Sequence, residues 1–293
     1  MFESWFSRLS DLVSPNFCAG FIAGLPTALI CAPFDTIRVR MQVETFCEEK
    51  LQSHSLLRLI RNTLQEEGLA GLYAGFSVTL VAMPLQLSLY FALYEKSKKW
   101  LKGLGDFQAN VLAAVAAGSV SNVLTNPLWL VRTRMMTQHL HKTNKYTGLW
   151  QALLRVSREE GWTALFQGVS ASLLGLVHVV IQFPVYEWMK LEIAGDEQPT
   201  FVQMLYLTAI PKLLASAASY PQEVLRSRLC DLNKAQRQPF RNLRELVAVS
   251  WRLEGLKGFY VGFWVNSIRI LPATFATLWT YEQVLHVLHK LNY

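Results

Sequence analysis

The chain reads Pro33-Phe-Asp35-Thr-Ile-Arg38-Val-Arg40 at the end of its first long apolar stretch. This block returns twice, each time 94 residues later. Its copies are Pro127-Leu-Trp129-Leu-Val-Arg132-Thr-Arg134 and Pro221-Gln-Glu223-Val-Leu-Arg226-Ser-Arg228. We call each copy a Pro block. Because a fixed period is typical of repeat architectures, we expect three repeats, at 1–104, 105–197 and 198–293.

Two further blocks recur in step with the first. One pairs glutamate with glycine and adds a later glycine: Glu67-Gly68 with Gly71 and Gly75, Glu160-Gly161 with Gly168, Glu254-Gly255 with Gly258 and Gly262. The other, the Tyr-Glu block, closes each repeat: Tyr94-Glu95, Tyr186-Glu187 and Tyr281-Glu282. Three blocks that repeat in register make chance similarity a poor explanation.

The composition is that of a membrane protein. Of the 293 residues, 52% are hydrophobic and 12% aromatic, and the mean hydropathy is +0.21. Six stretches approach the roughly 20 residues that a membrane-crossing helix needs. They are Phe17–Phe34, Phe76–Tyr94, Phe107–Val131, Val169–Tyr186, Pro199–Gln222 and Val261–Tyr281. The alternating pattern of a barrel strand is absent from them, so we expect six transmembrane helices, two per repeat.

The connections within each repeat contain a further amphipathic segment. Helical apolar spacing predicts three short surface helices, at Leu56–Glu67, Leu149–Glu160 and Leu243–Glu254. An even number of spans places both termini on one side of the membrane. All three Pro blocks end odd-numbered spans, so they lie together at one face of the membrane. All three Tyr-Glu blocks end even-numbered spans and lie together at the opposite face.

Several other classes are excluded by what the sequence lacks. The first span follows only sixteen residues, without the pattern of a secretory leader. The four cysteines have no metal-site spacing, so we expect no metal and no cofactor. The basic residues alternate with acids, which argues against a nucleic-acid partner. Nucleotide-fold, P-loop, HExxH and complete GxSxG motifs are missing, so we expect no enzyme.

With its three Pro, Glu-Gly and Tyr-Glu blocks, the whole chain resembles the mitochondrial carrier family. The resemblance implies a six-helix bundle with threefold pseudosymmetry in the inner mitochondrial membrane, with peroxisomal or plastid membranes as alternatives. It implies solute exchange by alternating access between two ion-pair gates, and we expect a monomer. Ionisable residues within a membrane usually line an aqueous path, which agrees with a transporter.

The family pattern assigns a matrix gate to the Pro blocks. By resemblance, Asp35 pairs with Arg132 and Glu223 with Arg38, while Trp129 leaves Arg226 without an acid. Gln42 matches a glutamine that braces one of these ion pairs. The prolines permit helix kinks, because they remove a backbone hydrogen bond; they are Pro33, Pro127 and Pro221. The alternative for Asp35 and Arg38 is a simple pair on one helix surface.

The cytoplasmic gate is incomplete in the same way. The resemblance pairs Glu95 with Lys190 and Glu282 with Lys98, and leaves Glu187 without a partner. It also gives three tyrosines as donors to these pairs: Tyr94, Tyr186 and Tyr281. A basic residue that the family often has before the even helices, near cardiolipin, is absent here. We therefore expect cardiolipin contact through helix N-terminal amides, weaker than is usual.

Residues that break the threefold symmetry are candidates for solute binding. Lys212 stands where the other repeats have Gly24 and Gly118, about 16 Å along the helix from Glu223. Arg269 lies about 20 Å from Glu282, again near the middle of the membrane. A cation at this depth is costly unless it faces water or an anion. The alternative for each is a structural salt bridge inside the bundle, but no acid without an assigned partner is evident nearby.

The fourth span adds a local resemblance. From Gly175 to Glu187 it is similar to carriers of NAD and, less closely, of folate and FAD, which makes Leu174, Gly175 and His178 further candidates. Trp129 is shared with carriers of NAD, FAD, folate or pyrimidine nucleotides. Its indole could stack on a base or belong to an interfacial aromatic belt, and His178 could equally be a helix-packing residue.

Two cations and a tryptophan suit a base joined to a diphosphate, so we expect NAD as the solute. FAD or folate and pyrimidine nucleotides stay open, since Tyr220-Pro221-Gln-Glu223 resembles the last group too. A non-transporting membrane scaffold on the same fold is the alternative from another class. It would predict degenerate gates and no central cations.

Overall fold

The computed structural model describes residues 15–47, 56–101, 106–141, 146–175, 177–193, 200–231 and 243–290. These residues form helices and turns and contain no strand. Five helices are long: α2 (Pro15–Cys47), α5 (Phe76–Trp100), α6 (Asp106–Thr137), α10 (Phe201–Asp231) and α12 (Phe263–Lys290). The sixth position of the bundle is shared by α8 (Val169–Leu174) and α9 (Val177–Ile193). The expected all-α fold of three helix pairs is confirmed.

The six positions differ in how well they suit a membrane. Within the described residues, two helical segments are long and apolar enough to cross one, Gly68–Trp100 and Gln108–Thr137. The expected single span Val169–Tyr186 is wrong, because the helix is divided after α8. A Cβ atom on Gly175 would lie 2.8 Å from Nε2 of Gln222, so this glycine permits close contact with α10.

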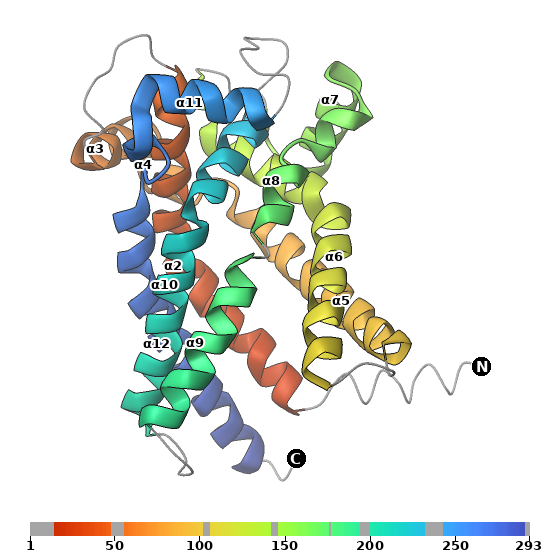
Figure 1. The fold of residues 1–293 in the computed structure, drawn as a ribbon. Helices are drawn as coiled ribbons and strands as arrows, with labels where there is room; N and C mark the ends of the chain where they lie inside the picture. The colour runs from red at the N-terminus through yellow and green to blue at the C-terminus, as the bar shows by residue number, and fades with distance from the viewer. Residues whose placement is uncertain are drawn as a thin grey trace.

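The even helix of each repeat packs along the odd helix of the next repeat. α5 lies against α6, α9 against α10, and α12 against α2, which closes the ring (Figure 1). α2 begins and α12 ends at one end of the bundle, as an even number of spans requires. The fold therefore interlocks the repeats.

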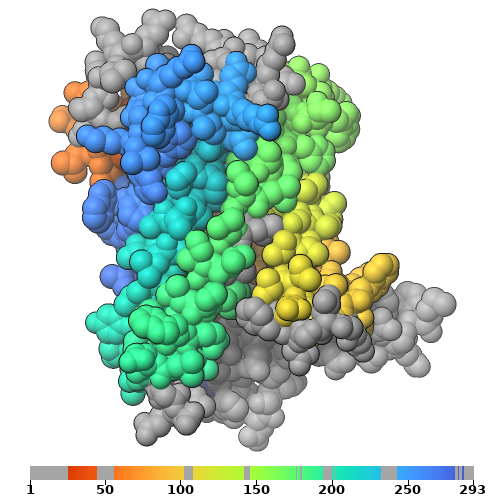
Figure 2. Space-filling model, in the orientation of Figure 1, coloured from red at the N-terminus to blue at the C-terminus, as the bar shows by residue number. Residues whose placement is uncertain are grey.

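Short helices cover the opposite end. They are α3 (Leu56–Glu66), α4 (Gly68–Leu72), α7 (Leu149–Glu159), the 3-10 helix η1 (Trp162–Phe166) and α11 (Leu243–Gly258). The three expected surface helices are thus confirmed as α3, α7 and α11. Figure 2 shows α7 and α11 on the surface at this end of the molecule.

A glycine with positive φ starts the even helix in each repeat. The φ angles are 73° at Gly75, 83° at Gly168 and 80° at Gly262, a region that side chains disfavour. Space is also limited: a Cβ atom on Gly75 would lie 2.9 Å from the carbonyl oxygen of Arg132. The glycine of the second repeated block therefore lets the even helix turn tightly against the next repeat.

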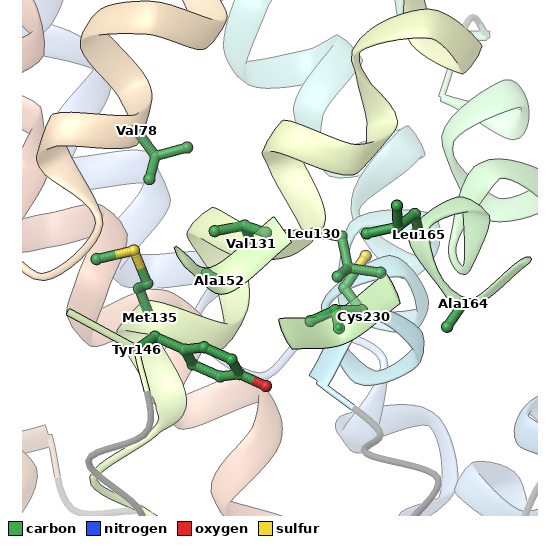
Figure 3. Close-up of a cluster of buried hydrophobic side chains, with 10 residues drawn as sticks. Val78, Leu130, Val131, Met135, Tyr146, Ala152, Ala164, Leu165 and Cys230 are labelled. Atoms are coloured by element: carbon green, nitrogen blue, oxygen red, sulfur yellow. The ribbon is translucent and has the colours of Figure 1, made fainter. Parts of the chain in front are cut away.

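A buried apolar cluster fixes α6 at this end. Leu130 and Val131 pack with Val78 of α5, Val156 of α7 and other side chains (Figure 3). The remaining members are Met135, Tyr146, Ala152, Ala164, Leu165 and Cys230. Trp129 and Arg132, three residues apart on α6, lie outside this cluster and line a cavity described below.

Candidate functional site

The structure brings together the four residues that the resemblance paired between Pro blocks. Nη2 of Arg132 on α6 lies 2.8 Å from Asp35 on α2. Nη1 of Arg38 on α2 lies 2.7 Å from Glu223 on α10. Two ion pairs therefore connect three odd helices at one level, which we call the Pro-block end.

The prolines that precede these acids lie inside their helices. Pro33 belongs to α2, Pro127 to α6 and Pro221 to α10, and each helix continues beyond its proline. A proline inside a helix removes one backbone hydrogen bond and crowds the preceding turn. Each of the three odd helices therefore lacks one backbone hydrogen bond close to the ion pairs.

Asp35 holds more than the one arginine assigned to it. Nη1 of Arg269 lies 2.8 Å from its Oδ1, and Nη2 of Arg38 lies 3.7 Å from the same oxygen. Arg269 therefore shares the acid that the resemblance assigned to Arg132, which supports the salt-bridge alternative for this residue. The reason is the packing of α12 along α2, which sets residues far apart in sequence side by side.

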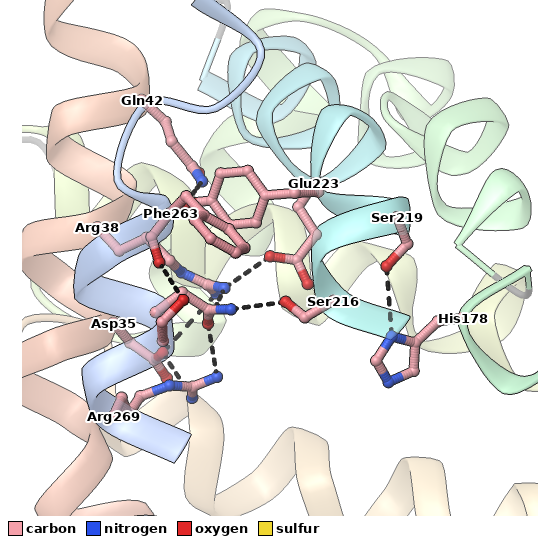
Figure 4. A network of polar contacts seen from close by, with 12 residues as sticks. Asp35, Arg38, Gln42, His178, Ser216, Ser219, Glu223, Phe263 and Arg269 are labelled. Atoms are coloured by element: carbon pink, nitrogen blue, oxygen red, sulfur yellow. Dashed lines mark hydrogen bonds and ion pairs between the residues drawn. The ribbon is translucent and has the colours of Figure 1, made fainter. Parts of the chain in front are cut away.

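Asn266 connects the two acid-bound arginines in a way that the sequence analysis missed. Its Oδ1 accepts hydrogen bonds from Arg38 at 2.9 Å and from Arg269 at 3.0 Å (Figure 4). Its amide nitrogen donates to Ser216 on α10 at 2.8 Å. The available signal was a single asparagine in an apolar stretch, three residues before Arg269.

Among the described residues, Gln42 forms no side-chain hydrogen bond to either ion pair. It is buried, and its amide nitrogen donates to the hydroxyl of Tyr220 at 3.1 Å. That hydroxyl donates in turn to the carbonyl oxygen of Val261 at 3.0 Å. Gln42 and Tyr220 therefore join α2 and α10 to the turn before α12, beside the Arg38–Glu223 pair.

A second layer of ion pairs, also missed, lies beyond the first. The last arginine of each Pro block is buried and pairs with the glutamate of its own Glu-Gly block: Arg40 with Glu67, Arg134 with Glu160, Arg228 with Glu254. Each Nε also donates to a carbonyl oxygen of another repeat, at Met136, Cys230 and Gln42 respectively. The arginines belong to the Pro blocks and the glutamates to the Glu-Gly blocks, but the spacing of these blocks in the sequence does not show that the two side chains meet.

A cavity of about 280 Å³ opens next to the first layer. Four basic side chains and one carboxylate line it: Arg38, Arg132, Lys212, Arg269 and Asp35. Since Glu223 neutralises Arg38, the cavity keeps an excess of two positive charges. Within the described residues, Lys212 has no ion pair and no hydrogen bond from its side chain.

The candidates for base recognition are divided by the structure. Trp129 lines the cavity, and its indole nitrogen donates to Oε1 of Gln86 at 2.8 Å. Leu174, Gly175 and His178 do not line it. Nδ1 of His178 lies 3.3 Å from the hydroxyl of Ser219 on α10, and Leu174 is exposed. Lys212, Arg269 and Trp129 thus share one site, and the other three lie apart from it.

The Tyr-Glu end differs. Glu95, Lys98, Glu187 and Lys190 form no ion pair with one another in the described part of the chain. The Tyr94 hydroxyl donates to Asn110 at 3.2 Å, and Tyr186 is half-buried. The side chains of Tyr281 and Glu282 lie outside the described residues.

The sequence profile of the mitochondrial carrier protein family matches the chain at residues 11–105, 103–196 and 197–292. A Saccharomyces cerevisiae mitochondrial nicotinamide adenine dinucleotide transporter is 33% identical over 90% of this chain and 74% of its own. A chloroplastic nicotinamide adenine dinucleotide transporter of Arabidopsis thaliana is 33% identical, covering 92% and 90%. An Arabidopsis chloroplastic folate transporter is 30% identical, covering 94% and 96%.

Three matches cover nearly all of the chain, and the structure has the corresponding three helix pairs. The family consists of transporters rather than enzymes, and the chain is accordingly a carrier. It belongs to the mitochondrial carrier family.

Proposed function

We propose that this carrier exchanges NAD, or a closely related dinucleotide, across the inner mitochondrial membrane. The observation that carries the proposal is Lys212, a cation without an ion pair in the described residues, in one cavity with Arg269 and Trp129. Two relatives named as NAD transporters, each 33% identical over at least 90% of this chain, support the choice of solute.

Charge favours a dinucleotide over a triphosphate. The cavity's excess of two positive charges matches the two negative charges of a diphosphate. A triphosphate would leave about two negative charges without partners where screening is poor. In the proposed complex the diphosphate lies between Lys212 and Arg269.

Size places the rest of the solute. Pockets that enclose a drug-sized ligand usually measure about 300–1,000 Å³, and this cavity measures about 280 Å³. A dinucleotide therefore extends beyond it. We propose that one base lies against Trp129 or, outside the cavity, against the surface at Leu174, Gly175 and His178.

The unequal ends support alternating access. We propose that the ion pairs at Asp35 and Glu223 close the Pro-block end, and that this end faces the matrix. In the opposite state the Tyr-Glu end closes through Glu95 with Lys190 and Lys98 with Glu282. We also propose that a monomer suffices, since one chain supplies the whole cavity, and that cardiolipin binds at the even-helix N-termini.

Reconstitution into liposomes tests the proposal. We expect uptake of labelled NAD that is much faster into vesicles preloaded with NAD than into empty ones. Lys212→Ala should abolish uptake, whereas Lys257→Ala, which removes an exposed lysine of α11, should retain it. Equal uptake into loaded and empty vesicles would contradict exchange and indicate uniport.

Competition decides among the alternatives. Unlabelled NAD should inhibit uptake more strongly than FAD, folate, UTP or CTP at equal concentration. Stronger inhibition by folate or FAD would favour the second candidate, which the similarity to a folate transporter supports. Stronger inhibition by UTP or CTP would favour a pyrimidine-nucleotide carrier. No uptake of any of these solutes by folded protein would favour a non-transporting scaffold.

A further inference from the structure

Trp129 occupies the acid position of the second Pro block, and the structure shows what it contacts there. The acids at this position in the other blocks, Asp35 and Glu223, each hold an arginine of another repeat. Arg226, left without an acid, forms no ion pair among the described residues, and its guanidinium carbon lies 6.0 Å from the centre of the Trp129 ring. The guanidinium carbon of Arg132 lies 5.2 Å from the same ring.

A polar chain fixes the orientation of this indole. Trp129 donates its single N–H to Oε1 of Gln86 at 2.8 Å. The amide nitrogen of Gln86 donates to Oδ1 of Asn122 at 2.8 Å. The chain joins α5 to α6, the two helices that lie in the most membrane-like segments. Polar side chains inside a membrane need such partners, so the chain holds the indole edge toward α5 and leaves its face to the arginines.

We propose that Trp129 replaces the missing carboxylate by holding Arg226 through a cation–π contact, and that Gln86 is its positioning residue. The Pro-block end is then closed by two ion pairs and one uncharged connection between α6 and α10. The inference rests on the proposed carrier function, because a connection that breaks and re-forms has a role only in a protein whose ends open alternately.

The replacement has two physical consequences. A cation–π contact shifts an equilibrium by about twofold to thirtyfold, less than a well-formed buried ion pair with its hydrogen bonds. The closed end is therefore easier to open than three ion pairs would make it. Because the indole brings no negative charge, it leaves the positive charge of Arg226 uncompensated at this end of the bundle.

A double-mutant cycle on the protein without solute tests the positioning role. The four proteins are wild type, Gln86→Leu, Trp129→Phe and the double variant, each purified in detergent and melted. Trp129→Phe keeps an aromatic ring but removes the N–H. We expect each single change to lower the apparent melting temperature and the double change to lower it no further, since both remove the same hydrogen bond. Gln182→Leu, on α9, is the matched control and should leave the apparent melting temperature unchanged.

An acid at position 129 tests the connection itself. Trp129→Glu gives Arg226 a carboxylate, and we expect a higher melting temperature and exchange at least about tenfold slower, because the closed end opens less readily. The proposal is overturned if the Gln86 and Trp129 effects add fully, or if both single changes leave the melting temperature unchanged. It is equally overturned if Trp129→Glu folds and speeds exchange.

The two proposals fail in different measurements. If Trp129 only stacks on a solute base and does not hold Arg226, Trp129→Glu raises the KM for uptake but does not raise the empty protein's melting temperature. If the carrier proposal is wrong, wild-type vesicles take up no dinucleotide, whatever the outcome of the melting cycle.

Discussion

Both ends of the helix bundle carry charged residues, but the structure uses them differently at the two ends. At the Pro-block end, Arg38 and Arg132 are bound to acids of other repeats, and Arg269 joins them at Asp35. At the Tyr-Glu end, Glu95 and Lys190 form no ion pair among the described residues. In the structure, one end thus has ion pairs between repeats, and the other end has charges that stand apart.

The Pro-block end itself contains two kinds of contact. The second layer, the buried Arg–Glu pairs that we call the outer layer, is the same in all three repeats, including its hydrogen bonds to another repeat. The first layer, the ion pairs of Asp35 and Glu223, which we call the inner layer, breaks this symmetry at Trp129. A symmetric, buried layer is suited to holding the repeats together in every state, whereas a partly exposed and incomplete layer is suited to opening.

The largest effect should come from breaking the symmetric layer. Arg40→Ala leaves the Glu67 carboxylate buried without its arginine and removes the hydrogen bond to the carbonyl of Met136. Removing one partner of a buried ion pair costs about 3–5 kcal/mol. We therefore expect a marked loss of folded protein and a much lower apparent melting temperature in detergent.

The matched control is Arg155→Ala. Arg155 also pairs with a glutamate, Glu159, at 2.7 Å, but both side chains are more than a third exposed on α7. Exposed pairs contribute under about 1 kcal/mol, so the melting temperature should hardly change. Equal losses for the two variants would show that the outer layer does not hold the repeats together.

The second effect separates the two central cations. Both Lys212→Ala and Arg269→Ala should abolish NAD exchange, because each removes a proposed phosphate contact. Their stabilities should differ: Arg269→Ala removes one arginine from Asp35, at a cost of about 1–3 kcal/mol. Lys212→Ala removes a cation without an ion pair and should leave the melting temperature unchanged or raise it.

Melting curves and vesicle uptake of the same preparations provide the measurement. Equal destabilisation by both changes would mean that Lys212 has a structural role. Retained exchange by Arg269→Ala would mean that this arginine serves Asp35 and Asn266 alone, and would remove it from the proposed binding site.

Much of this architecture could be predicted from the sequence because it repeats. The 94-residue period places Asp35, Arg132, Arg38 and Glu223 at equivalent positions of a threefold bundle, so their pairing follows from symmetry and resemblance. The surface helices follow from amphipathic spacing, since an exposed helix must separate its apolar and polar faces.

Contacts that break the symmetry could not be predicted. The Arg269–Asp35 pair depends on how α12 packs along α2, and no pattern in either segment specifies that distance. At Gly175, directly after α8, a Cβ atom would lie 2.8 Å from Nε2 of Gln222 on α10, and no pattern in either segment specifies this closeness. Asn266 and Gln86 are polar residues with partners on other helices, Arg38 and Trp129, and residue type alone does not show which donor each accepts from.

The smallest effect on stability and exchange should come from a substitution at the Tyr-Glu end. Glu95 is exposed and forms no ion pair with the described residues. Glu95→Gln should therefore change the free energy of unfolding by no more than about 0.5 kcal/mol and hardly shift the melting temperature. It should still slow NAD exchange by up to about fivefold, since the proposed pair with Lys190 contributes under about 1 kcal/mol when that end closes. Glu187→Gln, at the acid for which we expect no partner, is the matched control and should exchange at nearly the wild-type rate. A fall in melting temperature with Glu95→Gln would mean that this end is already held together in the observed state. Equal slowing by both changes would instead assign the effect to lost negative charge at the entrance rather than to a specific ion pair.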